Sequence, residues 1–256
     1  MEITQYILAN YSTFLFVLVR TGSILLAAPI FGAVNVPMQV KLGLTFVIAL
    51  LLTPLTPQVA MPQTMIAVAT SIAGEIMIGV TIGFAIRFVL TGIEFAGQVA
   101  GFQMGIGMAS AYDPIHSAQI TVLGKFLSIL TLLIFLTVNG HLMVIMALKK
   151  SFDVIPPYGF TLSGSLMEGF ISFSREIFVL AFKFSAPVVA ILIFVNVALG
   201  IMARTVPQIN MFVIGFAVTI MVGFLMIGLS MPYFEAAVET AFERMWQGVF
   251  NLMRVM

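Results

Sequence analysis

Long stretches without a charged residue dominate the pattern along the chain. No Asp, Glu, Lys or Arg occurs in residues 21–40, 42–74, 126–148, 184–203 and 205–234. A helix that spans a membrane needs about 20 mainly apolar residues, and several of these stretches are long enough. A membrane β-barrel would instead show segments of about ten residues that alternate between apolar and polar positions, and none is visible. The pattern therefore predicts an all-α integral membrane protein with six to eight hydrophobic helices.

Prolines, glycines and charges divide these stretches into expected helices. Pro29 and Pro54 follow the first two, because proline ends or kinks a helix, and Pro187 is expected to kink a long one. The last expected helix is amphipathic. The expected helices cover residues 6–28, 38–53, 64–90, 92–109, 118–149, 166–202, 209–229 and 232–254.

Composition narrows the class of protein. Hydrophobic residues make up 61% of the chain and charged residues only 8%, with a net charge of +1, and the mean hydropathy is +1.16. Soluble domains carry about a quarter charged residues. These values exclude a soluble globular enzyme and a basic nucleic-acid-binding protein. The chain has no cysteine, which excludes disulfides and thiolate metal sites.

The sequence offers no catalytic or cofactor-binding motif. Its two histidines, His116 and His141, are far apart, and neither has a second histidine or a carboxylate one helical turn away. No phosphate-binding loop, nucleophile elbow or H-E-x-x-H zinc motif occurs. We therefore expect no enzymatic activity, no metal and no cofactor.

Glycines are concentrated in the middle of the chain, and two interpretations of them remain open. Gly97, Gly101, Gly105 and Ala109 recur every four residues, as do Gly79 and Gly83. Small residues at this spacing let two helices approach closely, which predicts a tight helix–helix seam. The other interpretation concerns residues 105–114, where glycines weaken the helix and neighbouring methionines are soft and adaptable. That stretch would be a loop that moves inside a pore.

Several ionisable residues lie within or beside the apolar stretches, where charge is costly. Such residues usually pair with one another or line a pathway. We expect interhelical or intersubunit ion pairs. A proton relay is the weaker alternative, because the apolar core contains no carboxylates that lie within one helical turn of one another. The residues in question are Arg20, Lys41, Glu75, Arg87, Glu94, Asp113, Lys125 and Arg204, of which Arg20, Glu75, Arg87, Glu94 and Lys125 are the candidates for pairing.

Three blocks of sequence are similar to a known family. They are RTGSILLAAPIFGAVNVPMQVKLGL at 20–44, GEIMIGVTIGFAIRFVLTGIEFAGQVAGFQMGIGMASAYDP at 74–114 and NVALGIMARTVPQINMFVIGF at 196–216. Together they resemble the FliR family of flagellar export-gate proteins, which is shared with the T-subunit of injectisome type III secretion. The resemblance runs in order over almost the whole chain.

The resemblance implies an architecture and partners. Residues 1–165 would resemble a FliP subunit and residues 166–256 a FliQ subunit, each built from tilted helical hairpins. One copy of the chain would join FliP and FliQ homologues in a hetero-oligomeric gate in the bacterial inner (cytoplasmic) membrane, at the flagellar basal body. Unfolded export substrates would cross its pore, with FlhB on the cytoplasmic side and no nucleic acid involved. Much of the assembly would lie above the membrane plane, so the apolar stretches would be buried by partner chains as well as lipid.

The same resemblance implies two functional segments. A plug that seals the pore would comprise Met104, Gly105, Ile106, Gly107, Met108, Ala109, Ser110, Ala111, Tyr112, Asp113 and Pro114. The tip of a FliQ-like hairpin, close to where FlhB docks, would contain Arg204, Pro207, Gln208 and Asn210.

A secondary transporter of a small solute is the alternative from another class. Transporters of this kind contain inverted repeats and broken helices around a binding site at the membrane midplane. Gly105, Gly107 and Pro187 could imitate helix breaks, but no repeat is visible in the sequence. A transporter would purify alone or as a small homo-oligomer, whereas a gate subunit would need its partner chains.

Overall fold

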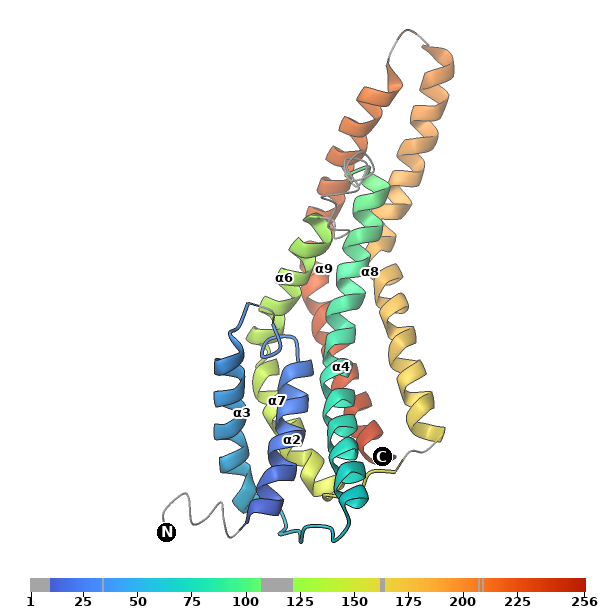
Figure 1. Ribbon diagram of the computed structural model, residues 1–256. Helices are drawn as coiled ribbons and strands as arrows, with labels where there is room; N and C mark the ends of the chain where they lie inside the picture. Colours follow the sequence, from blue (N-terminus) through green and yellow to red (C-terminus); the bar gives the residue numbers. More distant parts are fainter. Residues whose placement is uncertain (1–9, 34, 107–121, 162–163, 207, 209) are drawn as a thin grey trace. The chain divides into compact units, whose positions relative to one another are not determined.

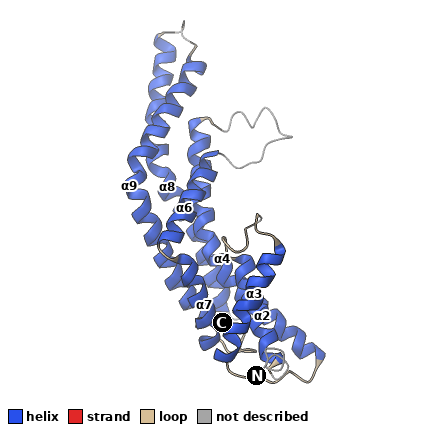
Figure 2. Ribbon diagram, turned by 90° about the vertical axis from the view of Figure 1, so that its left-hand side faces the viewer, coloured by secondary structure: helices blue, strands red, loops and turns tan. Residues whose placement is uncertain are grey.

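The computed structural model describes residues 10–33, 35–106, 122–161, 164–206, 208 and 210–256. This part of the chain folds into seven α-helices and one short 3-10 helix, with no strand (Figures 1 and 2). The predicted all-α integral membrane protein is thus confirmed. The helices are α2 (Tyr11–Ala27), α3 (Met38–Leu52), η1 (Thr53–Leu55), α4 (Met65–Met104), α6 (Val122–Thr137), α7 (Gly140–Val154), α8 (Gly164–Thr205) and α9 (Met211–Met253).

The chain forms two compact units. The first contains residues 1–87, 136–173 and 242–256, and the second contains residues 88–135 and 174–241. Three long helices, α4, α8 and α9, each contribute residues to both units. The division at residue 165 into FliP-like and FliQ-like parts stays a prediction.

Two of the predicted helix breaks are wrong. Helix α4 runs without interruption through Thr91, where a break between two helices was expected, and α9 runs through Pro232. An internal proline removes one backbone hydrogen bond. The 43 residues of α9 keep the rest of their ladder, so a single proline does not end the helix.

Two other helices end earlier than the sequence predicts. A single helix was expected over residues 118–149, but α6 ends at Thr137 and α7 begins at Gly140. Asn139 separates them in a left-handed conformation with φ of 57°, which asparagine tolerates better than most residues. The helix expected to reach residue 109 ends at Met104, where Gly105 has φ of +84°.

Glycines in α4 make the predicted helix–helix seam. In the first unit, a Cβ on Gly79 would lie 2.9 Å from the Arg20 carbonyl of α2, and one on Gly83 would lie 3.0 Å from the Ala27 backbone. In the second unit, a Cβ on Gly97 would lie 2.5 Å from the Gly124 Cα of α6. Only hydrogen fits at these positions, so the seam is confirmed for Gly79, Gly83 and Gly97.

Four of the described helical segments are long and apolar enough to span a membrane, or five if α6 and α7 form one bent span. The four segments are 38–55, 65–104, 164–205 and 213–253. In the most apolar windows of the last two, only 11% of the residues are buried within the chain, against 61% for α4. The exposed apolar surface of α8 and α9 must therefore be covered by lipid or by another protein.

Candidate functional site

Helix α4 ends in a defined hydrogen-bonded turn where the predicted plug begins. The Ile106 N–H donates to the Gly101 carbonyl at 3.0 Å, and the Gly105 N–H donates to the Phe102 carbonyl, also at 3.0 Å. This pair of bonds is the Schellman motif, which needs a left-handed residue after the helix. Glycine adopts the φ of +84° at position 105 without the steric cost of a Cβ. The departure point of the predicted plug is therefore fixed by local geometry.

Met104, the last residue of α4, is fully buried. Beside it lies an open pocket of about 420 Å³ in the second unit. Side chains of α4, α8 and α9 line this pocket, among them Gln103, Met104, Asn196, Phe216 and Thr219. Of the predicted plug, Met104, Gly105 and Ile106 are described; residues 107–114 lie outside the described residues.

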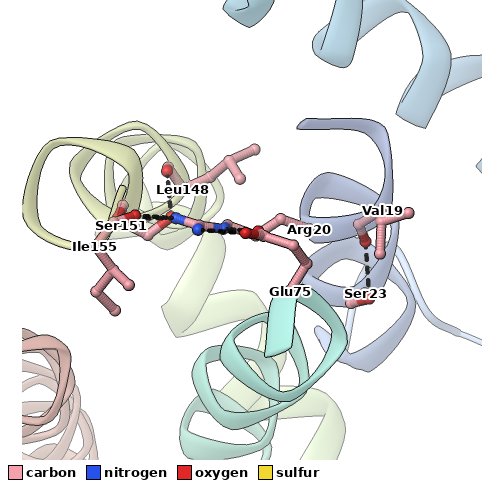
Figure 3. A network of polar contacts seen from close by, with 7 residues as sticks. All are labelled: Val19, Arg20, Ser23, Glu75, Leu148, Ser151 and Ile155. Carbon is pink, nitrogen blue, oxygen red and sulfur yellow. Dashed lines mark hydrogen bonds and ion pairs between the residues drawn. The ribbon is translucent and has the colours of Figure 1, made fainter. Parts of the chain in front are cut away.

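A buried ion pair joins α2 and α4 in the first unit (Figure 3). Arg20 of α2 and Glu75 of α4 are 0% and 1% exposed. The pair is bidentate: Arg20 Nε donates to Glu75 Oε2 at 2.5 Å, and Arg20 Nη2 donates to Oε1 at 3.0 Å. Two-pronged contacts between guanidinium and carboxylate are among the strongest charge-assisted hydrogen bonds. Both residues were expected to form ion pairs, and the structure brings them together across two helices.

The same guanidinium also binds the end of α7. Its Nη1 donates to the carbonyls of Ser151 and Ile155, each at 2.9 Å. Figure 3 shows the guanidinium between Glu75 on one side and these two residues on the other. The Phe152 ring centroid lies 4.2 Å from Arg20 Cζ, which adds a cation–π contact. One side chain thus joins α2, α4 and α7.

Sequence reasoning missed the α7 side of this cluster. Backbone carbonyls carry no signal in a sequence, and Phe152 is one of 24 phenylalanines. Only the position of Ser151 and Ile155 at the end of a helix indicates that their carbonyls accept hydrogen bonds from elsewhere, because the last carbonyls of any helix need donors from outside it.

The other candidate charges have no such partner in the described part of the chain. Arg87 and Lys125 are exposed and Glu94 is half-buried. Arg20–Glu75 is the salt bridge found among the described residues. Pairing of Arg87, Glu94 and Lys125 with other subunits stays a prediction.

The predicted hairpin tip lies between two long helices. Helix α8 ends at Thr205 and α9 begins at Met211, and Arg204, Gln208 and Asn210 are exposed. Asn210 caps α9, because its Oδ1 accepts from the Val213 N–H at 3.4 Å. Pro207 lies outside the described residues.

Tyr158 lies in the connector between α7 and α8 and has a positive φ of 72°. Its hydroxyl donates to the Ala60 carbonyl at 2.7 Å, and its ring packs edge-on against Phe16. Partial burial, followed by the negative charge of Glu75, raises the pKa of the Tyr158 hydroxyl above its usual value. The hydroxyl therefore stays a neutral donor at physiological pH.

No group of three or more His, Asp or Glu side chains that could hold a metal occurs in the described residues. Among the described residues, the buried charged side chains are Arg20 and Glu75, and they belong to a single cluster.

Comparison with known proteins places this chain in a family. Residues 11–245 match the bacterial export proteins, family 1. The chain is 32% identical to the flagellar biosynthetic protein FliR of Pectobacterium carotovorum subsp. carotovorum over 245 residues, covering 94% of this chain and 91% of the relative. It is 32% identical to FliR of Escherichia coli K12, covering 92% and 89%. FliR of Bacillus subtilis 168 is 30% identical, with 95% of each chain covered.

Proposed function

We propose a function from one premise: this chain belongs to the bacterial export proteins of family 1. That membership makes it a membrane component of the flagellar export apparatus. The finer proposal is that it is one subunit of the gate through which unfolded proteins cross the inner membrane at the flagellar basal body. FliP and FliQ homologues would be its partners in the gate, and FlhB would dock near Arg204, Gln208 and Asn210.

The exposed apolar helices support the proposed partners. Large side chains along α8 and α9 that are more than half exposed include Phe182, Phe194, Met221 and Leu225. A lone chain would leave this surface to lipid alone. A gate in which similar hairpins stand side by side would bury it against apolar surfaces of the same kind.

The proposed action is mechanical. The segment that follows Met104 would seal the pore against ions, and an arriving substrate would displace it. The single observation that carries this assignment is the turn at Gly105: the chain leaves the 40-residue helix α4 there through a Schellman motif. In the proposed seal, glycine at 105 and 107 would give the backbone freedom, and methionine at 104 and 108 would give a deformable contact.

Deleting residues 107–112 tests the seal. The deletion leaves α4, Gly105 and Ile106 in place, so the gate should assemble with unchanged stoichiometry. Ion conductance through the assembled gate, measured in planar bilayers, should rise well above that of the wild type. Ser110→Ala serves as the control, because it keeps the length of the segment, and should conduct like the wild type. If the gate with the deletion assembles and conducts ions no better than the wild type, the proposed seal is wrong.

A further inference from the structure

A second open pocket lies between α8 and α9, within the second unit. Its volume of about 350 Å³ is typical of sites that bind a small molecule. Lys183, Ser230 and Tyr233 line it, together with the apolar residues Phe184, Pro187, Met226, Leu229, Phe234 and Ala237. The Ser230 hydroxyl donates to the Met226 carbonyl of its own helix at 2.8 Å. Lys183 and Tyr233 are therefore the polar side chains of the pocket that a ligand would meet.

The polar and apolar parts of the pocket lie at different levels of the two helices. Lys183 immediately precedes the charge-free stretch of α8, and Tyr233 lies near the end of the charge-free stretch of α9. The two residues are equally far along the chain from the turn that joins the helices. Toward that turn, the pocket is lined by Pro187 on α8 and by Leu229 and Met226 on α9. The pocket is thus amphipathic, with an apolar end that faces into the charge-free stretches.

This polarity matches the boundary between lipid headgroups and acyl chains. Beyond Lys183, the charge-free stretch of α8 has about 20 residues, which is the length that spans the hydrocarbon core. Tyrosine is enriched where the hydrocarbon meets water, and lysine at this level extends its charged group toward the headgroups. We therefore expect Lys183 and Tyr233 at the level of the lipid phosphates, and Met226 and Leu229 at the level of the acyl chains.

The charge of Lys183 is not balanced within the described part of the chain. Lys183 forms no salt bridge there. The carboxylates nearest to the pocket in sequence, Glu176 on α8 and Glu235 on α9, do not line it. Pro187 has no N–H, so the Lys183 carbonyl also lacks its usual helical donor. An ionisable residue beside an apolar span usually has a partner, and here that partner must be an anion from outside the described chain.

We propose that this pocket binds one anionic phospholipid of the surrounding membrane. The lipid phosphate binds the Lys183 ammonium group and the Tyr233 hydroxyl. One acyl chain lies against Pro187, Met226 and Leu229. A phosphate ion alone would leave the apolar wall uncovered, and an uncharged lipid would leave the lysine without a counter-charge. The inference rests on the membrane location of the chain and not on the pore seal.

Lipid titration followed by native mass spectrometry measures the binding. The full-length chain, in the assembly in which it purifies, would be delipidated in mild detergent and titrated with phosphatidylglycerol or with phosphatidylcholine, which has no net charge. One lysine near an anionic lipid strengthens binding about fivefold. We therefore expect one site per chain that prefers phosphatidylglycerol by about this factor. Equal affinity for the two lipids would contradict the proposal.

Two charge variants locate the site. Lys183→Gln removes the charge and keeps most of the side chain, so it should weaken the binding of phosphatidylglycerol about fivefold. Arg175→Gln is the matched control, because Arg175 is an exposed cation of the same helix that does not line the pocket. It should bind phosphatidylglycerol like the wild type. If Lys183→Gln binds this lipid as tightly as Arg175→Gln does, the proposal is wrong.

A second pair of variants tests the position of the acyl chain. Leu229 lines the pocket and is 64% exposed, whereas Leu225, one turn earlier on α9, is 63% exposed and does not line it. Leu229→Asn should weaken the binding of phosphatidylglycerol severalfold, because it places an amide against the acyl chain. Leu225→Asn should have little effect. Equal affinities in these two variants would show that no acyl chain occupies the pocket, as for a site that binds the phosphate alone.

A single thiol reports occupancy of the pocket directly. The native chain has no cysteine, so Met226→Cys provides the one thiol of the chain. Phosphatidylglycerol should slow its reaction with a maleimide severalfold, and adding Lys183→Gln should remove most of this protection. A reaction rate that does not depend on the lipid would overturn the proposal. Protection that persists after delipidation and ends when the assembly is dissociated would show that another subunit covers the pocket, which also overturns it.

Discussion

Arg20 is the largest of the fully buried side chains in the described chain, and it is charged. Burying an ion costs several kcal/mol, which is recovered only when its hydrogen-bonding groups are well satisfied. Here Glu75 takes two donors of the guanidinium, and the carbonyls of Ser151 and Ile155 share a third nitrogen. The arrangement fixes how α2, α4 and α7 meet, because none of these partners tolerates a shift of much more than an ångström.

The pair can be tested at a single residue. Glu75→Gln leaves Arg20 buried without a counter-charge, so we expect a loss of about 3–5 kcal/mol in the free energy of unfolding. The measurement is the melting temperature of the purified gate. Lys150→Gln is the control, since Lys150 is exposed and has no ion pair among the described residues. Equal melting temperatures for the Glu75→Gln variant and the wild type would contradict the role given to the pair.

A variant without either charge measures how much the contacts between Arg20 and α7 contribute to stability. The double variant Arg20→Leu with Glu75→Leu has no buried charge, and should be more stable than Glu75→Gln alone. It should still fall short of the wild type, because the Ile155 carbonyl loses its donor at a cost of about 1–3 kcal/mol. A double variant as stable as the wild type would show that binding of α7 by Arg20 is dispensable.

At the scale of the elements, the sequence predicts where helices exist better than where they stop. Each described helix overlaps one expected from the sequence, although α6 and α7 were expected as a single helix. Apolar length is a strong signal for the presence of a helix. The errors fall at Thr91, Pro232 and Asn139, where tertiary packing and a left-handed asparagine decide the outcome. The glycine spacing does predict the seam along α4, although the facing residues of α2 and α6 emerge only from the fold.

The seam provides an element-scale prediction. Gly83→Val would drive a side chain into the Ala27 backbone of α2, so we expect a loss of about 1–3 kcal/mol in stability. Gly43→Ala is the matched control in α3, where a Cβ meets nothing within 4 Å; alanine should instead raise helix stability by up to about 1 kcal/mol. Thermal unfolding of both variants in the purified gate provides the measurement. A harmless Gly83→Val would show that α2 and α4 are not closely packed there.

At the scale of the whole molecule, the fold explains why one sequence reveals only part of the candidate site. The Arg20–Glu75 pair could be predicted as pairing residues, because charge within apolar helices demands partners. The contacts of Met104 with Thr219 and Gly223 could not, since these residues lie more than a hundred positions from Met104 and nothing in their spacing links them. The exposed apolar surfaces of α8 and α9 must be covered from outside the described chain, by lipid or by another protein.

The most direct test of the central claim is the mass of the assembly. This 27.8 kDa chain would be tagged, co-expressed with the FliP and FliQ homologues of its host, and weighed intact by native mass spectrometry. The account predicts a large hetero-oligomer that contains a single copy of the chain. A stable lone chain or a homodimer, with no FliP or FliQ bound, would contradict it and would favour a small-solute transporter instead.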